Sequence, residues 1–158
     1  MKTSPLPIQP KTSRRAATDR SESELGRIKR ALGLLSAANR AMRSAVCQIE
    51  LLESLCRIII DAGGYHFVWI GYAENDEKKT VTPVAQAGFD GGVLSGLFIS
   101  WDETTPNGQG TAGTVLRSGQ PCIVRSCATD PRMSAWREPL LSRGFASLAS
   151  FPLRFDDI

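Results

Sequence analysis

The stretch GGYHFVWIGYA, residues 63–73, decides the fold. A half-buried strand alternates apolar and polar side chains, so that one face meets the core and the other meets water. This strand instead carries large apolar groups on both faces. One face has Tyr65, Phe67 and Trp69, and the other has Val68, Ile70 and Tyr72. The chain's own helices should cover one face, and the cover of the other face has to be identified.

The polar segment ENDEKKT, residues 74–80, joins this strand to a second extended run from about Thr80 to Ala87. Two strands joined by a short polar connection form an antiparallel hairpin. Pro83 cannot donate a hydrogen bond to a neighbouring strand, so the second strand is predicted at a sheet edge. The hairpin is preceded by an apolar segment, residues 49–61, which predicts a helix that stops at Gly63-Gly64.

The composition is that of one soluble domain with a tail. The chain has 158 residues, of which 42% are hydrophobic and 22% charged. The net charge of +3 comes entirely from residues 1–23, which hold five basic and two acidic residues. The rest of the chain is balanced, so it offers no basic face for nucleic acid.

Residues 1–23 are rich in Pro, Ser, Thr and Arg, a composition that predicts a disordered basic tail. Pro5, Pro7 and Pro10 interrupt the place where a signal peptide would need its apolar segment. No apolar run approaches the length of a membrane span. We therefore expect a cytoplasmic protein without a membrane partner.

Residues 24–48 carry a heptad pattern. Apolar positions recur at alternating spacings of three and four, with a single Asn at an a position. The stripe consists of Leu25, Ile28, Leu32, Leu35, Asn39, Met42, Val46 and Ile49. Two interpretations remain open: a coiled-coil connector that pairs with a second copy through residues 25–49, or an amphipathic helix folded against its own domain. A break is expected within Ser44–Gln48.

The second half of the chain alternates short helices and strands. A glycine turn, a short helix at 111–117 and a stop at Gly119 precede a strand that follows Pro121. A turn at Asp130-Pro131 opens a helix that ends at Gly144, and a strand follows at about 146–155. This order predicts an α+β domain with a largely antiparallel sheet.

Catalytic and metal-binding chemistry finds little support in the sequence. The four cysteines, Cys47, Cys56, Cys122 and Cys127, contain no CxxC pair, and His66 is the single histidine, so a zinc site is not expected. His66 has no evident nucleophile beside it. We expect no enzyme activity and keep a redox role for Cys122 and Cys127 as a minor alternative.

Four segments resemble a known family: GGYHFVWIGYAENDEKKTVTPVAQAG, GQGTAGTVLRSGQPCIV, TDPRMSAWREPLLSRGFAS and the closing FPL. They look like a GAF domain, especially those of bacterial sensor histidine kinases and of proteins with GGDEF or EAL output domains. The resemblance covers about residues 24–155. It implies a twisted antiparallel β-sheet with helices packed on one face, a ligand pocket on the other, and a signalling helix that pairs in a parallel dimer.

The sequence departs from that family at several points. A full GAF domain continues beyond Asp156-Asp157 through another strand and a terminal helix, so residues 49–158 are expected to lack these elements. Ser126 and Cys127 stand where many relatives have an acidic and an aliphatic residue. No bilin, haem or metal signature is found, and neither is a cyclic-nucleotide motif, so the cofactor and the ligand stay unknown.

The resemblance places a pocket on the Phe67, Trp69 and Gly71 face of the opening strand, where Gly71 would let a ligand approach the backbone. The segments that would roof this face supply Trp101, Asp102, Asp130, Arg132, Trp136 and Arg137. The alternative is that the aromatic residues belong to the core.

These features favour a sensory module that binds a small molecule and relays its state through a dimeric helix. Two-component or cyclic-di-GMP signalling, with a histidine kinase or diguanylate cyclase as output partner, is the expected context. A ligand-free dimerisation or protein-interaction module is the main alternative. A GAF-type methionine sulfoxide reductase using Cys122 and Cys127 is a further one.

Overall fold

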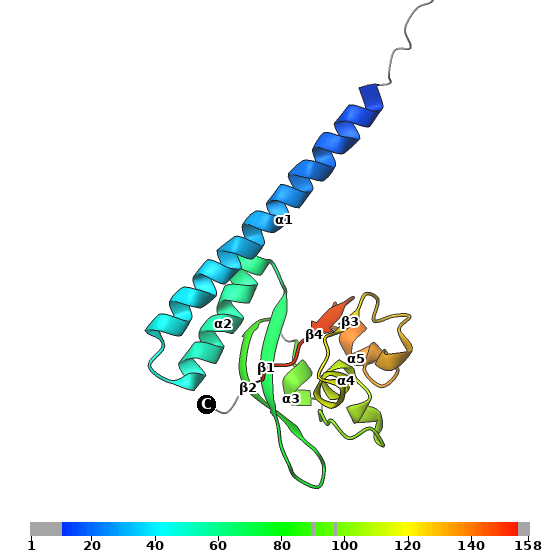
Figure 1. The fold of residues 1–158 in the computed structure, drawn as a ribbon. Coiled ribbons are helices and arrows are strands. Elements are labelled where there is room, and N and C mark those ends of the chain that lie inside the picture. The colour runs from blue at the N-terminus through cyan, green and yellow to red at the C-terminus, as the bar shows by residue number, and fades with distance from the viewer. Residues whose placement is uncertain (1–10, 90, 97, 155–158) are drawn as a thin grey trace, which may run out of the picture.

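The computed structural model describes residues 11–89, 91–96 and 98–154, with side chains from Ser23 onward. It begins with two antiparallel helices, α1 (Lys11–Ser44) and α2 (Gln48–Gly63), and α2 lies between α1 and the strands (Figure 1). Gly64 ends α2 in the left-handed conformation, with φ 73°, and its N–H donates to the Ile60 carbonyl. This stop agrees with the sequence prediction.

The start of α1 differs from the sequence prediction. The sequence predicts a disordered tail over residues 1–23, whereas the helix runs from Lys11. These residues contain neither Gly nor Pro after Pro10 and include several good helix formers, so they can extend the helix that follows. Residues 1–10 of the predicted tail lie outside the described residues.

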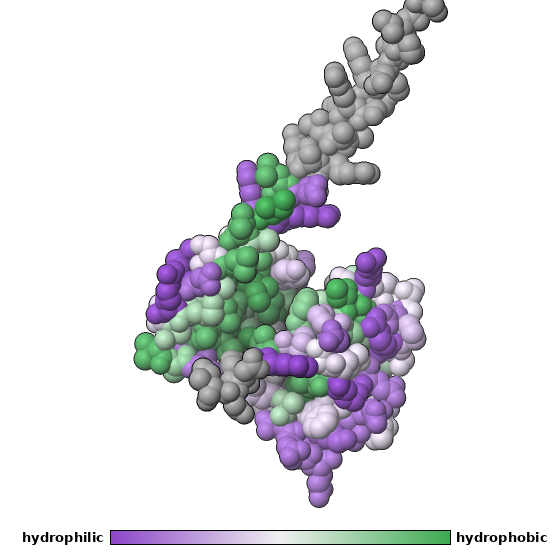
Figure 2. Space-filling view, viewed as in Figure 1, coloured by the Kyte–Doolittle hydropathy of each residue, from purple (hydrophilic) through white to green (hydrophobic). Residues whose placement is uncertain are grey.

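Two opposite faces of α1 have different surroundings. Leu34, Ala37 and Ala41 are partly buried, and Ala37 and Ala41 line a groove shared with Ser54 and Ile58 of α2. The heptad stripe lies on the other face, where Leu32 is 61% and Leu35 is 62% exposed. Apolar surface is visible along α1 in Figure 2. Within the described residues the stripe is therefore not folded against its own domain.

The predicted break between α1 and α2 is present at residues 45–47. The sequence contains no Gly or Pro from Leu34 to Ala62, so no residue in the break forbids a helix. The Val46 N–H donates to Glu50 Oε2 at 3.1 Å, while the Val46 side chain is 91% exposed. Helix α2, which follows this turn, packs against α1 and against the strands β1 and β2.

The opening strand and its partner form the predicted antiparallel hairpin, β1 (Phe67–Ala73) and β2 (Val81–Gly88). The register shifts between Ile70 and Gly71. At the hairpin turn the Asp76 carboxylate accepts hydrogen bonds from the Thr80 N–H at 2.8 Å and the Thr80 hydroxyl at 2.7 Å. These bonds close the turn and set the pairing of the two strands.

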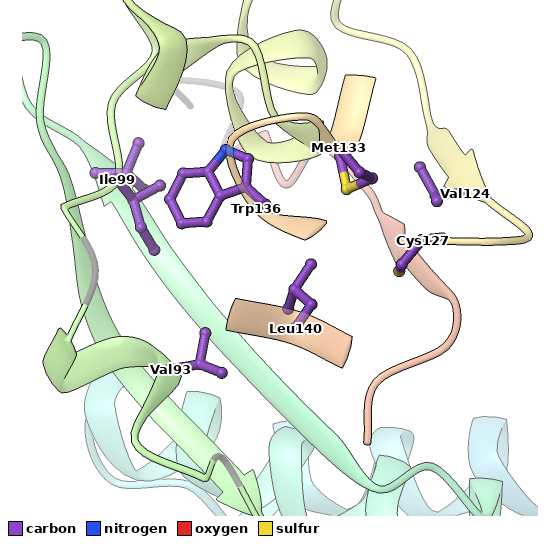
Figure 3. Close-up of a cluster of buried hydrophobic side chains, with 8 residues drawn as sticks. Val93, Ile99, Val124, Cys127, Met133, Trp136 and Leu140 are labelled. Carbon is purple, nitrogen blue, oxygen red and sulfur yellow. The ribbon is translucent and has the colours of Figure 1, made fainter. Parts of the chain in front are cut away.

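Each face of the hairpin packs against a separate hydrophobic cluster. On the helix side, Leu52 and Cys56 of α2 are buried with Ala85, and Val68 and Ile70 pack against them, as expected. The other cluster lies between the hairpin and the second half of the chain (Figure 3). Its buried members are Val81, Val93, Ile99, Val124, Cys127, Met133, Trp136 and Leu140. The second cover of β1 is therefore protein.

The second half consists of short elements. They are α3 (Val93–Gly96), the 3₁₀ turn η1 (Pro106–Gly108), α4 (Thr111–Ser118), β3 (Cys122–Val124), η2 (Pro131–Met133), α5 (Arg137–Leu141) and β4 (Leu148–Ser150). β3 and β4 pair antiparallel. The α+β class is confirmed, with one difference: the described strands form two separate pairs rather than one continuous sheet.

Two of these elements are shorter than predicted. The helix expected after Asp130-Pro131 is divided into η2 and α5, because the Asp130 side chain caps the Arg132 N–H and Pro131 begins a tight 3₁₀ turn. The strand expected at 146–155 is regular only from Leu148 to Ser150, where it faces the equally short β3.

The packing between the hairpin and the second hydrophobic cluster can be tested at Gly71. A Cβ at this position would lie 2.5 Å from the Trp69 ring and 2.9 Å from Val81 Cγ1. We expect Gly71→Ala to lower the free energy of unfolding in urea by about 1–3 kcal/mol, the usual cost of overpacking. Gly33→Ala is the control, since nothing lies within 4 Å of its Cβ position and alanine favours a helix. Equal stability of Gly71→Ala and wild type would contradict this packing.

Candidate functional site

The predicted floor of the pocket is filled by the protein's own side chains. Trp69 packs against the second cluster, and Gly71 closely approaches the Trp69 ring. The Phe67 ring lies against Phe145, with 6.0 Å between ring centroids. This arrangement favours the core interpretation of the three residues, and a ligand contact for them stays a prediction.

Trp136, predicted to roof the pocket, lies within the same cluster and is 8% exposed. Its ring lies beside Ile99 in Figure 3. Its buried Nε1 has no hydrogen-bond partner among the described residues, and a Cβ on Gly110 would lie 2.8 Å from it. The absence of a side chain at Gly110 gives the indole the space it occupies.

Trp101 and Asp102 hold the tip of the hairpin to the second half of the chain. The Trp101 Nε1 donates to the Glu74 carbonyl at 3.0 Å, and Lys79 Nζ lies 5.1 Å from the Trp101 ring centroid. Lys79 Nζ is also 3.8 Å from Asp102 Oδ1. The backbone N–H of Thr104 donates to Asp102, and this bond is the main reason for the lowered pKa of that carboxyl. The contacts of Trp101 and Asp102 therefore join two parts of the fold and do not by themselves point to a ligand.

Asp130, Arg132 and Arg137 come together in the loop after β3. Arg132 Nε donates to Asp130 Oδ1 at 2.9 Å and its Nη2 donates to Oδ2, a two-point ion pair. Hydrogen bonds from the Arg132 side chain are the main cause of the lowered pKa of Asp130. Arg132 also reaches back to β3, where it donates to Cys122 Sγ at 3.0 Å and to the Ile123 carbonyl at 3.1 Å.

Arg137 braces the same loop from α5. Its Nε donates to the Cys127 carbonyl at 3.3 Å and its Nη2 to the Asp130 carbonyl at 3.1 Å. The loop is thus fixed to β3 by one arginine and to α5 by another.

A surface cavity of about 450 Å³ lies beside this loop. Its lining consists of Ile123, Arg125, Ser126, Thr129, Asp130 and Arg132. Of the predicted site residues the structure therefore brings Asp130 and Arg132 to a cavity, with Arg137 behind them. Trp101, Asp102 and Trp136 are not among its lining residues.

Sequence reasoning missed the contribution of Ile123, Arg125, Ser126 and Thr129 to a site. The available signal was the polar run RSCATD, residues 125–130, directly after a short strand with a buried end at Val124. Polar residues at the end of a strand are well placed to line a site, because loops carry function on a rigid scaffold.

The thiols and the other titratable groups give no sign of a metal centre. Cys56, Cys122 and Cys127 are buried and all cysteines are free. Burial raises the pKa of the Cys56 and Cys127 thiols. Among the residues described, no group of three His, Cys, Asp or Glu side chains could hold a metal ion. No described helix is both long and apolar enough to cross a membrane.

The chain belongs to the GAF domain family, whose model matches residues 49–158. A solved structure agrees with this assignment: the GAF domain of a phosphoenolpyruvate-protein phosphotransferase from Coxiella burnetii. The two chains share 13% sequence identity with a TM-score of 0.61, and the match covers 79% of this chain and 71% of that one. No curated protein matches.

The Asp130 and Arg132 pair predicts a pH dependence of stability. Because the pKa of Asp130 is lowered in the folded state, the ion pair contributes fully to stability at pH values above the pKa of the unfolded chain, about 3.9. The contribution is lost as the pH falls through the lower folded value. We expect Asp130→Asn to reduce stability at neutral pH and to flatten its decline in acid, measured by urea unfolding from about pH 6 to about pH 2.

Asp61→Asn is the matched control, since it removes one carboxylate from the exposed face of α2. Its stability should follow the wild-type pH profile. If Asp130→Asn followed that profile as well, the pair would have no role in holding the loop.

Proposed function

We propose that this GAF domain is the sensory module of a signalling protein, which binds a small molecule and passes its state to a second copy through α1. The observation that carries the proposal is the outward-facing heptad stripe. A run of exposed apolar residues at heptad spacing is energetically unfavourable in water, and burying each large side chain contributes roughly 1.5–3 kcal/mol. The described members of the stripe in α1 with exposed apolar side chains are Leu25, Ile28, Leu32, Leu35 and Met42.

The arrangement of α1 supports a dimer rather than an alternative fold of the monomer. The face opposite the stripe, at Leu34, Ala37 and Ala41, is already used by α2. Asn39 occupies an a position, where a buried polar residue selects register and oligomeric state. A parallel pair of α1 helices would bury the stripe while leaving the α2 contact intact.

A physical route connects the loop after β3 to α1. Val124, at the end of β3, and Cys127 are buried in the cluster that covers Trp69 on one face of the hairpin. Val68 and Ile70 on the other face pack against Leu52 and Cys56 of α2. Helix α2 in turn lies against α1 (Figure 1). A ligand-dependent shift of the loop would thus reach α1 through two packed layers.

The proposed context is cytoplasmic signalling with a histidine kinase or diguanylate cyclase as the output partner, and the module itself carries out no catalysis. The methionine sulfoxide reductase alternative is not favoured, because its thiols would need access to substrate and Cys127 is fully buried.

A ligand-free dimerisation module is the second candidate. The observation that favours it is the packing at Phe67, Trp69 and Gly71, where the protein's own side chains lie against the face that the sequence predicts for a ligand. A thermal-shift screen with metabolites separates the two candidates, because a ligand that binds only the folded state raises the melting temperature. If the sensory proposal is correct, at least one metabolite should raise the melting temperature, and this increase should disappear when the residues that line the cavity are substituted.

The dimer is tested by Leu32→Glu, which places a charge at an a position of the stripe. We expect the wild-type chain to sediment as a dimer and Leu32→Glu to dissociate at least tenfold more readily, because a buried charge without a partner is costly. Arg30→Glu, two positions away and off the stripe, is the control and should sediment as wild type. A wild-type chain that stays monomeric at all concentrations would overturn the dimeric relay.

A further inference from the structure

The cavity beside the loop after β3 has an unbalanced positive charge. Three arginines lie at or directly behind it, Arg125, Arg132 and Arg137, against one carboxylate, Asp130. The donors of Arg132 are already engaged by Asp130, Cys122 and the Ile123 carbonyl. Arg137 is directed to two backbone carbonyls. The hydrogen bonds of Arg132 and Arg137 are thus used to hold the loop in place.

Arg125 differs from both of these arginines. It is exposed and lines the cavity, and its guanidinium makes no hydrogen bond or ion pair within the described part of the chain. The same holds for the side-chain hydroxyls of Ser126 and Thr129. The cavity thus presents a guanidinium and two hydroxyls as unused donors, on a loop whose backbone is fixed by its neighbours.

We propose that the cavity binds a small organic anion whose carboxylate or phosphate group pairs with Arg125. This inference rests on the proposed function and specifies the chemistry of the ligand. A guanidinium presents parallel N–H donors that match two oxygens of such a group, and this pairing is stronger than a neutral hydrogen bond. The Ser126 and Thr129 hydroxyls supply further donors to the same oxygens.

The rest of the cavity suits the remainder of such a molecule. Its volume of about 450 Å³ is in the range of small-molecule sites. The Ile123 side chain, 56% exposed, provides an apolar wall beside the charged groups. Asp130 does not oppose the anion with a free charge, since its carboxylate is neutralised by Arg132 in a two-point pair.

The test is a titration of the full isotope-labelled chain followed by backbone amide NMR shifts. The probes are inorganic phosphate and acetate, added at constant ionic strength, with choline chloride as the cationic comparison. We expect saturable shifts centred on residues 123–132 with at least one of the two anions and none with choline. Arg125→Gln should weaken the binding about tenfold or more, the usual loss when a charge-assisted hydrogen bond is removed.

Two variants complete the design. Arg125→Lys keeps the positive charge but loses the two parallel N–H donors of the guanidinium. Its affinity for the anion should therefore lie between those of wild type and Arg125→Gln. Arg30→Gln removes one arginine from α1 and should bind as wild type. Unchanged spectra elsewhere in Arg125→Gln would show that the exposed substitution leaves the fold intact.

The outcomes separate this inference from the proposed function. Equal binding by wild type and Arg125→Gln would overturn the inference, as would shifts that are linear and spread over the surface. Saturable binding of an uncharged or cationic compound at the same amides, without anion binding, would overturn the inference of an anion site. The proposed sensory function would still stand. If the chain were monomeric but bound anions through Arg125, the proposed dimeric relay would be wrong and the inferred anion site would stand.

Discussion

The hairpin of β1 and β2 must be covered on both faces, and the rest of the structure depends on that requirement. Val68 and Ile70 need the apolar side of α2, while Trp69 needs the cluster formed by the second half of the chain. Burial of large apolar groups on two sides of one strand is the dominant favourable contribution here. It fixes the order of layers as helix, hairpin and loop-rich half, with β1 at the centre.

The position of α1 follows from the first of these layers. Because α2 has its apolar side on the hairpin, only its outer side is left for α1, and small residues such as Ala37, Ala41 and Ser54 meet there. Small side chains allow a close approach but bury little apolar area. Apart from the partly buried Leu34, the large apolar residues of α1 lie on the opposite face and remain exposed. The fold thus separates the contact that holds α1 to its domain from the surface available to a second copy.

Local signals in the sequence predicted much of this fold. The Gly63-Gly64 stop, the hairpin and the helix that ends at Gly119 were all located, because each depends on a few adjacent residues. Gly71 is a point of close approach, as the sequence predicts, and the side chain that lies against it in the structure is Trp69. An aromatic residue suits a pocket roof as well as a core, so sequence alone left the role of Trp136 open. The cavity was not predicted, because the loop that lines it is held by contacts such as the hydrogen bond from Arg132 to Cys122, ten positions back, and no local pattern records such a contact.

The proposed relay depends most on the heptad stripe of α1 being the surface where two copies meet in register. Disulfide trapping tests this directly, with the exposed Cys47 replaced by Ser and a single cysteine introduced at Ile28, a d position of the stripe. In a parallel pair the two introduced thiols lie opposite each other, so mild oxidation should convert most of the Ile28→Cys protein to a covalent dimer. Arg30→Cys in the same background, off the stripe, should stay largely monomeric. Equal yields from the two positions, or no dimer from Ile28→Cys, would contradict the account.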